Sequence, residues 1–320
     1  MSEKKKYRKY FERDKSVNIR ITDQDKEILY SVYQHRFLNS DQIAAMIPGR
    51  TKHKISIRLN KLFHAGYLDR PRAKERRLAK QPFAYALGNN GAVVLGEKLD
   101  IDLSKINWTA KNQTAREAFV NHELMVADFM LAVKLACEKL DGVDFISLEE
   151  IINKRPVDLA KKMNGLEWKI KMGQDLPGFK KNFKFSLIPD SAFGLRFHEA
   201  NKKSKLAFFF VEVDRSTMPI QRNDLTKSSY YKKLVGYFES WRQKLYMANF
   251  GFTNPRLLSL TISKERIVSM IAANKKLDPR GNGLRMFLFA PAKTFSLAKP
   301  ETVFEQKWLN GREEVASLLD

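Results

Sequence analysis

The chain has 320 residues, of which 43% are apolar and 29% charged, so it is long enough for two domains and apolar enough to fold. It carries 58 lysine and arginine residues against 36 acidic ones, and the net charge of +22 predicts a polyanionic partner, first of all nucleic acid. The single cysteine, Cys137, excludes a disulfide framework and a cysteine-rich zinc site, and apolar runs of at most about six residues exclude a transmembrane helix, so we expect a cytoplasmic protein.

Positive charge is densest at the N-terminal end of the chain. The first 100 residues hold 22 basic and 11 acidic side chains, a net of +11, and the other 220 residues supply the remaining +11. We expect residues 1–20 to form a basic arm that binds the phosphate backbone, residues 21–105 to form a DNA-binding domain, and residues 106–320 to form a second domain.

Residues 21–105 show the pattern of three short helices, a β-hairpin and a final small helix. Thr22, Ser40 and Thr51 each precede a segment with helical apolar spacing and are suitable N-caps. Gly66 ends the third helix, and the apolar segments on either side of residues 70–80 are typical of short strands. This order predicts a winged helix-turn-helix domain, whose third helix enters the major groove of double-stranded DNA.

The third helix and the segment between the two strands are both basic. The eleven residues from Arg70 to Lys80 include six basic side chains and one acid, and we expect a wing loop that touches the DNA backbone. The alternative is a solvated charged hairpin on a winged helix that binds protein. The residues predicted to contact DNA are Lys52, Lys54, Arg58 and Lys61 on the helix and Arg72, Lys74, Arg76 and Arg77 on the wing.

The remainder of the chain shows an α/β pattern. Residues 112–139 predict a long helix, and further helices are expected at 225–246 and 264–274. Strands are expected at 143–146, 185–188, 206–213, 257–262 and 284–289.

Acidic residues occur where this pattern predicts strand ends. Asp190, preceded by Pro189, follows one strand, and Glu212 and Asp214 end an almost entirely apolar strand, where alternation places both side chains on one face. A buried carboxylate needs a compensating partner, and Mg²⁺ or Mn²⁺ suits hard oxygen ligands. The alternative to a metal site is an ion pair between a strand-end acid and an arginine such as Arg215.

This arrangement resembles the PD-(D/E)xK nuclease superfamily, in which an aspartate and a glutamate hold a metal ion and a lysine completes the site. The resemblance implies that Asp190 and Glu212 are metal ligands and catalytic residues. The chain has Asp214 at the motif's lysine position, where it would add a third carboxylate to the metal site. The resemblance then implies a lysine from the following helix, with Lys233 as the first choice, Lys232 as the second, and Lys227 as an alternative if the helix starts early.

The order of these segments is similar to that of the replication-relaxation family and of the MobC-type relaxases of mobilisable plasmids. The resemblance implies a restriction-endonuclease-like α/β domain after the winged helix. It also implies a relaxase that binds the origin of transfer of its plasmid, nicks one strand and works with accessory mobilisation or coupling proteins. The segments that carry the resemblance are His122-Glu123-Leu124, Pro189-Asp190, Phe210 to Thr217, and Lys233-Leu234 followed by Tyr237.

Several alternatives stay open at this point. Glu123 is a candidate to join the metal site from its helix, and Tyr231 is a candidate nucleophile, although activated water is the default for such a metal site. The departure from the motif at Asp214 also supports an alternative hypothesis, in which the protein only binds DNA and acts in plasmid replication or its regulation. A third hypothesis is an endonuclease that makes double-strand breaks.

Overall fold

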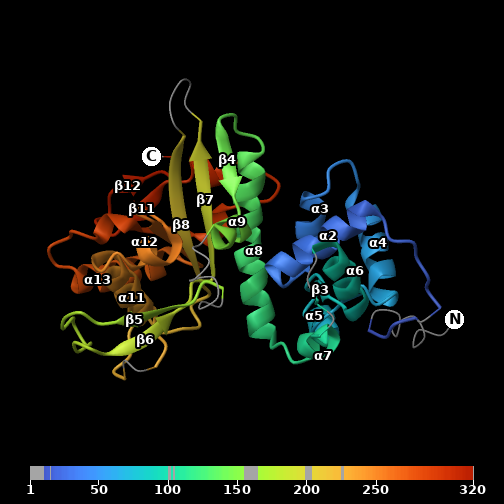
Figure 1. The fold of residues 1–320 in the computed structure, drawn as a ribbon, viewed down its shortest axis with the longest axis horizontal. Helices are drawn as coiled ribbons and strands as arrows, with labels where there is room; N and C mark the ends of the chain where they lie inside the picture. The colour runs from blue at the N-terminus through green and yellow to red at the C-terminus, as the bar shows by residue number, and fades with distance from the viewer. Residues whose placement is uncertain are drawn as a thin grey trace. The chain divides into compact units, whose positions relative to one another are not determined.

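The chain divides into two compact units, Met1–Leu131 and Ala132–Asp320, which are described separately below (Figure 1). The division falls within helix α8 (Glu117–Cys137). Residues 1–10 and 15, which form most of the predicted basic arm, lie outside the described residues. The computed structural model describes residues 11–14, 16–99, 102–103, 105–154, 165–198, 204–224 and 227–319.

The first unit consists of helices around a small antiparallel sheet. Its three strands have the order β1-β3-β2, so that β3 is the central strand. The elements are α2 (Asp23–His35), β1 (Leu38–Asn39), α3 (Ser40–Ala45), α4 (Lys52–His64), β2 (Leu68–Asp69), α5 (Ala73–Leu78), β3 (Ala84–Leu87), α6 (Asn89–Leu99), α7 (Trp108–Gln113) and the first part of α8.

Side-chain caps set the starts of the first helices. Thr22 caps α2 and Thr51 caps α4, as predicted. Helix α3 is capped by Asn39 and not by the predicted Ser40, which is its first helical residue. Asn39 is the N-cap because its side chain accepts main-chain N–H groups of the first turn. In return, the Gln42 side chain accepts the main-chain N–H of Asn39, which completes a capping box.

The connection between β2 and β3 differs from the predicted wing loop because it contains the helix α5. The sequence AKERRL consists of strong helix formers, and Arg72 enters the helix with a left-handed φ of 54°. Arg76 is buried on one side of α5, whereas Arg77 and Leu78 are exposed on the other. The β2–β3 connection therefore has an inner and an outer face, and its basic residues are not equivalent.

The second unit contains a large sheet and a separate hairpin. After the last part of α8, its elements are β4 (Val143–Ile146), α9 (Leu148–Asn153), β5 (Trp168–Lys171), β6 (Lys184–Leu187), β7 (Ser191–Phe197), β8 (Lys205–Asp214), α11 (Tyr230–Arg242), α12 (Leu245–Phe250), β9 (Arg256–Thr261), α13 (Lys264–Leu277), the 3₁₀ turn η1 (Leu284–Met286), β10 (Phe287–Pro291), the 3₁₀ turn η2 (Ala292–Thr294), α14 (Thr302–Glu305), β11 (Trp308–Asn310) and β12 (Val315–Ala316).

The large sheet is mixed and has the strand order β12-β11-β10-β9-β8-β7-β4. Strands β8, β9 and β10 run parallel, and the outer strands are antiparallel to their neighbours. Parallel neighbours need a crossover, which α11 and α12 supply between β8 and β9 and α13 supplies between β9 and β10. Helices combined with this mixed sheet confirm the α/β class predicted from the sequence.

Two predicted helices are each divided in two. The helix expected at 112–139 is α7 and α8, with Thr114 closing α7. The helix expected at 225–246 is α11 and α12, because Lys244 between them adopts a left-handed φ of 53° that no α-helix continues through. Residue 225 lies outside the described residues. Strands β5, β7, β11 and β12 are additional to the predicted strands.

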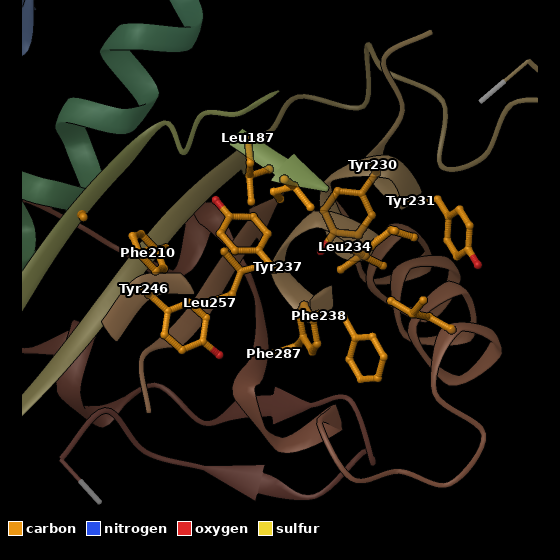
Figure 2. Close-up of a cluster of buried hydrophobic side chains, with 14 of the residues drawn as sticks. Leu187, Phe210, Tyr230, Tyr231, Leu234, Tyr237, Phe238, Tyr246, Leu257 and Phe287 are labelled. Atoms are coloured by element: carbon orange, nitrogen blue, oxygen red, sulfur yellow. The ribbon is translucent and has the colours of Figure 1, made fainter. Parts of the chain in front are cut away.

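The core of the second unit lies where α11 packs against the sheet and the hairpin (Figure 2). Phe210 of β8 is central to it, with its ring 5.8 Å from that of Tyr237 on α11 and 5.2 Å from that of Trp168 on β5. These contacts fix α11 against strand β8. The buried residues labelled in Figure 2 are Leu187, Phe210, Tyr230, Tyr231, Leu234, Tyr237, Phe238, Tyr246, Leu257 and Phe287.

Candidate functional site

Three of the predicted site residues meet in the second unit, although they are far apart along the chain. Asp190 lies directly before β7, Glu212 lies in the buried half of β8, and Lys233 lies near the start of α11. The Lys233 Nζ atom is 3.5 Å from Asp190 Oδ1 and also forms an ion pair with Glu212 Oε2. One ammonium group thus bridges two carboxylates from different elements.

Strand β8 holds Asp190 in place. The main-chain N–H of Asp190 donates to the carbonyl of Val211 over 3.1 Å, and the N–H of Val213 donates to Asp190 Oδ2 over 2.7 Å. One carboxylate oxygen is therefore fixed by the strand, and the other is left for the ammonium group of Lys233.

Glu212 is only 3% exposed, and a tyrosine orients it. The hydroxyl of Tyr237 donates to Glu212 Oε1 over 2.7 Å, while Lys233 contacts Oε2. Sequence reasoning missed this role of Tyr237. The available signal was its position four residues after Lys233, which places the two side chains on one face of α11.

Burial and charge act against each other at this cluster. Burial raises the pKa of Glu212 to about 8, although the charge of Lys233 acts in the opposite direction. Burial favours the neutral amine of Lys233, but the carboxylates of Glu212 and Asp190 outweigh it and raise the pKa of Lys233. Lys233 therefore stays protonated at neutral pH, and the pKa of Glu212 lies above its ordinary value.

The donor set fits Mg²⁺ or Mn²⁺. In the described part of the chain, no group of three or more histidine, cysteine, aspartate or glutamate side chains is arranged to hold a metal ion. Magnesium, however, is commonly bound by one or two carboxylates, with waters and substrate phosphate completing its shell. Asp190 and Glu212 already converge on one positive charge, that of Lys233, as two such carboxylates must.

Asp214, the predicted third metal ligand, has a different environment. Its Oδ2 accepts from Arg266 Nε over 2.6 Å and from the hydroxyl of Thr261 over 3.2 Å, and its Oδ1 accepts from Arg266 Nη2 over 3.2 Å. The pairing of a strand-end acid with an arginine thus occurs here, with Arg266 in place of the suggested Arg215. These bonds tie β8 to β9 and α13, and the metal-ligand role of Asp214 stays a prediction.

Two alternative residues on α11 are also engaged elsewhere. The Nζ atom of Lys232 lies 5.8 Å and 5.5 Å from the ring centroids of Phe183 and Phe185, next to the hairpin. Tyr231 is fully buried, and its hydroxyl donates to the carbonyl of Pro177 over 3.0 Å. Burial raises the pKa of Tyr231 to about 12, which disfavours the phenolate that a nucleophile requires.

Glu123, the remaining alternative metal ligand, belongs to the first unit. It lies on α8 near Arg36, where burial lowers the pKa of Arg36 and the charge of Glu123 partly offsets that effect. Glu123 is therefore part of the charge balance of the first unit.

The predicted DNA contacts in the first unit fall into two groups. Arg58 donates to both oxygens of Asp25 and to the carbonyl of Arg20, and Arg72 donates to the carbonyl of Ala115. These hydrogen bonds stabilise the unit itself, and the DNA contacts predicted for Arg58 and Arg72 stay predictions. The exposed predicted contacts are Lys52, Lys54 and Lys61 on α4 and Lys74 and Arg77 on α5.

Arg76 was predicted to contact DNA, but it is buried, with only 3% of its surface exposed. Its guanidinium donates to the carbonyl of Pro82 over 2.7 Å, to Glu117 over 2.8 Å and to Asn121 over 2.7 Å. These bonds tie the wing to α8. Arg76 consequently holds the wing in shape and does not reach outward.

A groove of about 520 Å³ lies in the first unit between the helical elements and the wing. Ser40 and Ser56 line it from α3 and α4, and Arg77 and Lys80 line it from the wing. Its polar and basic lining suits an anionic ligand.

Comparison with known proteins gives one match. The model of a family described as replication-relaxation matches residues 29–254. No curated protein and no solved structure matches the chain. Within the described residues, no helix has both the length and the apolar character needed to span a membrane.

Proposed function

The chain belongs to the replication-relaxation family, which indicates a role in plasmid replication or mobilisation, and we propose that it fulfils this role as a metal-dependent DNA-nicking enzyme. In this proposal the first unit binds double-stranded DNA at the origin of transfer. The second unit cuts one strand there, as a relaxase does. The observation that carries the proposal is the meeting of Asp190, Glu212 and Lys233.

The first unit supports DNA binding through its order of elements. Helix α2, strand β1, helices α3 and α4, and the β2–β3 pair follow one another as in a winged helix-turn-helix domain, with α4 as the recognition helix. The exposed face of α4 carries Lys54 and Lys61, and Arg77 and Lys80 line one groove together with Ser56 of α4. Basic side chains on both elements suit the phosphate backbone of a duplex.

The second unit supports cleavage through the chemistry of its cluster. Asp190 and Glu212 would hold Mg²⁺ or Mn²⁺, and a lysine from the following helix completes the site as in the PD-(D/E)xK superfamily. The bound metal ion would polarise the scissile phosphate and lower the pKa of its water ligand. Lys233, which is protonated, would offset the charge that builds up on the phosphate oxygens. Tyr237 would keep the Glu212 carboxylate aimed at the site.

The proposal is tested by nicking of supercoiled plasmid that carries the origin of transfer of the element. We expect the wild-type protein to convert supercoiled to open-circular DNA with Mg²⁺ or Mn²⁺. Asp190→Asn and Glu212→Gln should abolish this conversion while duplex binding, measured by fluorescence anisotropy, is unchanged. Glu265→Gln, an exposed acid on α13, is the matched control and should nick normally. Normal nicking by both site variants would refute the assignment.

A second candidate function is DNA binding without cleavage. It is favoured by the Glu-x-Asp pattern of β8, where Asp214 pairs with Arg266 and no lysine follows Glu212 on the strand. Absence of open-circular product with any divalent cation, together with specific binding to the origin, would select this function. Linear product would instead indicate a double-strand endonuclease.

A further inference from the structure

The β5–β6 hairpin has two different faces. Residues Trp168 and Ile170 on β5 and Leu187 on β6 are buried against the core. The alternate residues, Lys169 and Lys171, are exposed. Alternation along a strand therefore gives the hairpin an apolar inner face and a basic outer face.

The outer face places like charges opposite each other. In the antiparallel register Lys171 pairs with Lys184 and Lys169 pairs with Ser186, so three lysines share one side of the hairpin. Within the described residues, none of these three ammonium groups forms an ion pair. The acid Glu167, two residues before Lys169, lies on the same face. Like charges directly opposite destabilise a strand pair. A polyanion on this face would relieve the repulsion.

The hairpin is held rigidly on the helix that carries Lys233. Figure 1 shows β5 and β6 beside α11, and both strands contact this helix. At Gly236 of α11 the approach is so close that a Cβ atom would lie 3.1–3.2 Å from the side chains of Phe185, Ile170 and Leu187. The position of the basic face is thus fixed relative to the cluster of Asp190, Glu212 and Lys233.

The distance from the basic face to this cluster is short. Strand β6 ends at Leu187, and Asp190 follows three residues later. From Lys184 to Asp190 the chain spans at most about 20 Å even when fully extended. That distance corresponds to about six phosphates of one strand of duplex DNA, at about 3.4 Å each.

We propose that the outer face of the β5–β6 hairpin, formed by Lys169, Lys171 and Lys184, binds the sugar–phosphate backbone of the DNA strand within about six nucleotides of the position that is cut. This inference rests on the proposed function, because the cut position is defined by the cluster. It assigns the second unit its own DNA-binding surface in addition to the winged helix.

Hydroxyl-radical footprinting and equilibrium binding on an origin duplex, with Ca²⁺ in place of the catalytic cation, test this proposal. The triple variant Lys169→Ala, Lys171→Ala, Lys184→Ala should lose protection of a short backbone segment while protection by the winged helix stays. Its plot of log affinity against log salt should become flatter by about 2 to 3 units of slope. The matched control replaces three exposed lysines elsewhere in the second unit: Lys264, Lys299 and Lys307. An unchanged footprint and slope for the hairpin variant would overturn the proposal.

A charge reversal separates binding from folding. Lys171→Glu replaces the like pair with Lys184 by an opposite pair, so we expect a higher thermal midpoint together with weaker DNA binding. Unchanged DNA binding by this variant would also overturn the proposal. These readouts do not depend on cleavage. If the wild-type protein never nicks DNA but the triple lysine variant loses the footprint, the nicking activity is refuted and the hairpin assignment is retained.

Discussion

Strand β8 carries two buried acids two residues apart, and the comparison of their partners separates a chemical role from a structural one. Glu212 contacts the ammonium of Lys233, which also lies 3.5 Å from Asp190. Asp214 instead accepts both the Nε–H and the Nη2–H of Arg266. Glu212 and Asp214 are both buried carboxyl groups, but one pairs with a lysine and the other with an arginine.

The two cations have different consequences. A guanidinium matches a carboxylate with two fixed donors and cannot lose its proton, so the Asp214–Arg266 pair is saturated. An ammonium is a compact point charge, and Lys233 shares it between carboxylates from two elements while its side chain remains 27% exposed. Under the proposed function, a divalent cation and a phosphate would bind at the second arrangement, whereas the Asp214–Arg266 pair would stay intact.

The largest expected effect is a loss of stability on removal of the Asp214 carboxylate. Asp214→Ala leaves Arg266 without its carboxylate in a mostly buried site, and the free energy of unfolding should fall by about 3–5 kcal/mol. Urea unfolding measures this loss. The remaining folded protein should nick at the wild-type rate per molecule. A stable Asp214→Ala protein that does not nick would reverse the roles assigned to the two acids.

Loss of the bridging ammonium should affect the reaction instead. Lys233→Met should lower the single-turnover nicking rate by about 10²- to 10³-fold, because the charge on the phosphate oxygens is no longer offset. Lys232→Met is the matched control on the same helix, since Lys232 lies over the rings of Phe183 and Phe185. A larger loss for Lys232→Met would make Lys232 the catalytic lysine.

Metal affinity should depend on pH through Glu212. Only the ionised carboxylate binds a cation, and the pKa of Glu212 is raised to about 8 by burial, so Mn²⁺ affinity should fall about tenfold per pH unit below that value. Calorimetric titration between pH 6 and 9 measures this change. A flat profile would show that Glu212 is not a ligand.

The same shift in pKa affects stability with the opposite sign. The folded state binds the Glu212 proton more tightly than the unfolded state, whose pKa is near the ordinary value of 4.5. The contribution to stability is therefore full below pH 4.5 and is lost as the pH rises through about 8. The unfolding free energy of the metal-free wild-type protein should decline over this window relative to that of Glu212→Gln.

Tyr237→Phe should produce a smaller effect. Removing the hydroxyl deletes the hydrogen bond to Glu212 Oε1, which favours the ionised form, so the pH midpoint of metal binding should move upward. We expect about 1 kcal/mol lower stability and a modest loss of nicking at neutral pH. An unchanged midpoint would mean that Tyr237 only packs in the core.

The smallest effect should come from the exposed lysines of helix α4, the proposed recognition helix. Lys54→Ala combined with Lys61→Ala should reduce the salt slope of duplex binding by about 2 and leave stability unchanged. Arg58→Ala is the contrasting variant on the same helix and should lower stability, because it breaks the pair with buried Asp25. A reduced salt slope without loss of stability for Arg58→Ala would place Arg58 on the DNA.

Parts of this molecule were predictable from residue type and local pattern. Thr22 and Thr51 marked their helices, and the apolar run before Glu212 marked a buried strand. The alternation of Trp168 to Lys171 was also a readable strand signal. The motif selected Asp190, Glu212 and Lys233, which the structure brings together, and their catalytic roles stay predictions.

Other features depend on partners that local sequence does not reveal. Arg58 pairs with an acid 33 residues away and Arg76 with one 41 residues away, so neither could be distinguished from the exposed basic residues beside it. The partner of Asp214 is likewise 52 residues distant. Basic residues on a helix look alike in sequence, and only the folded chain shows which of them are used internally.

The register of β8 has a consequence for how this protein tolerates insertions and deletions. Val211 and Val213 flank Glu212 on a strand paired on both sides, with β7 and with β9. Deleting one residue upstream within the strand would move the acid to the opposite side of the sheet and put a valine in front of Lys233. Variation in chain length should therefore be confined to the ends of β8 and to its connections, while the central segment keeps a constant number of residues.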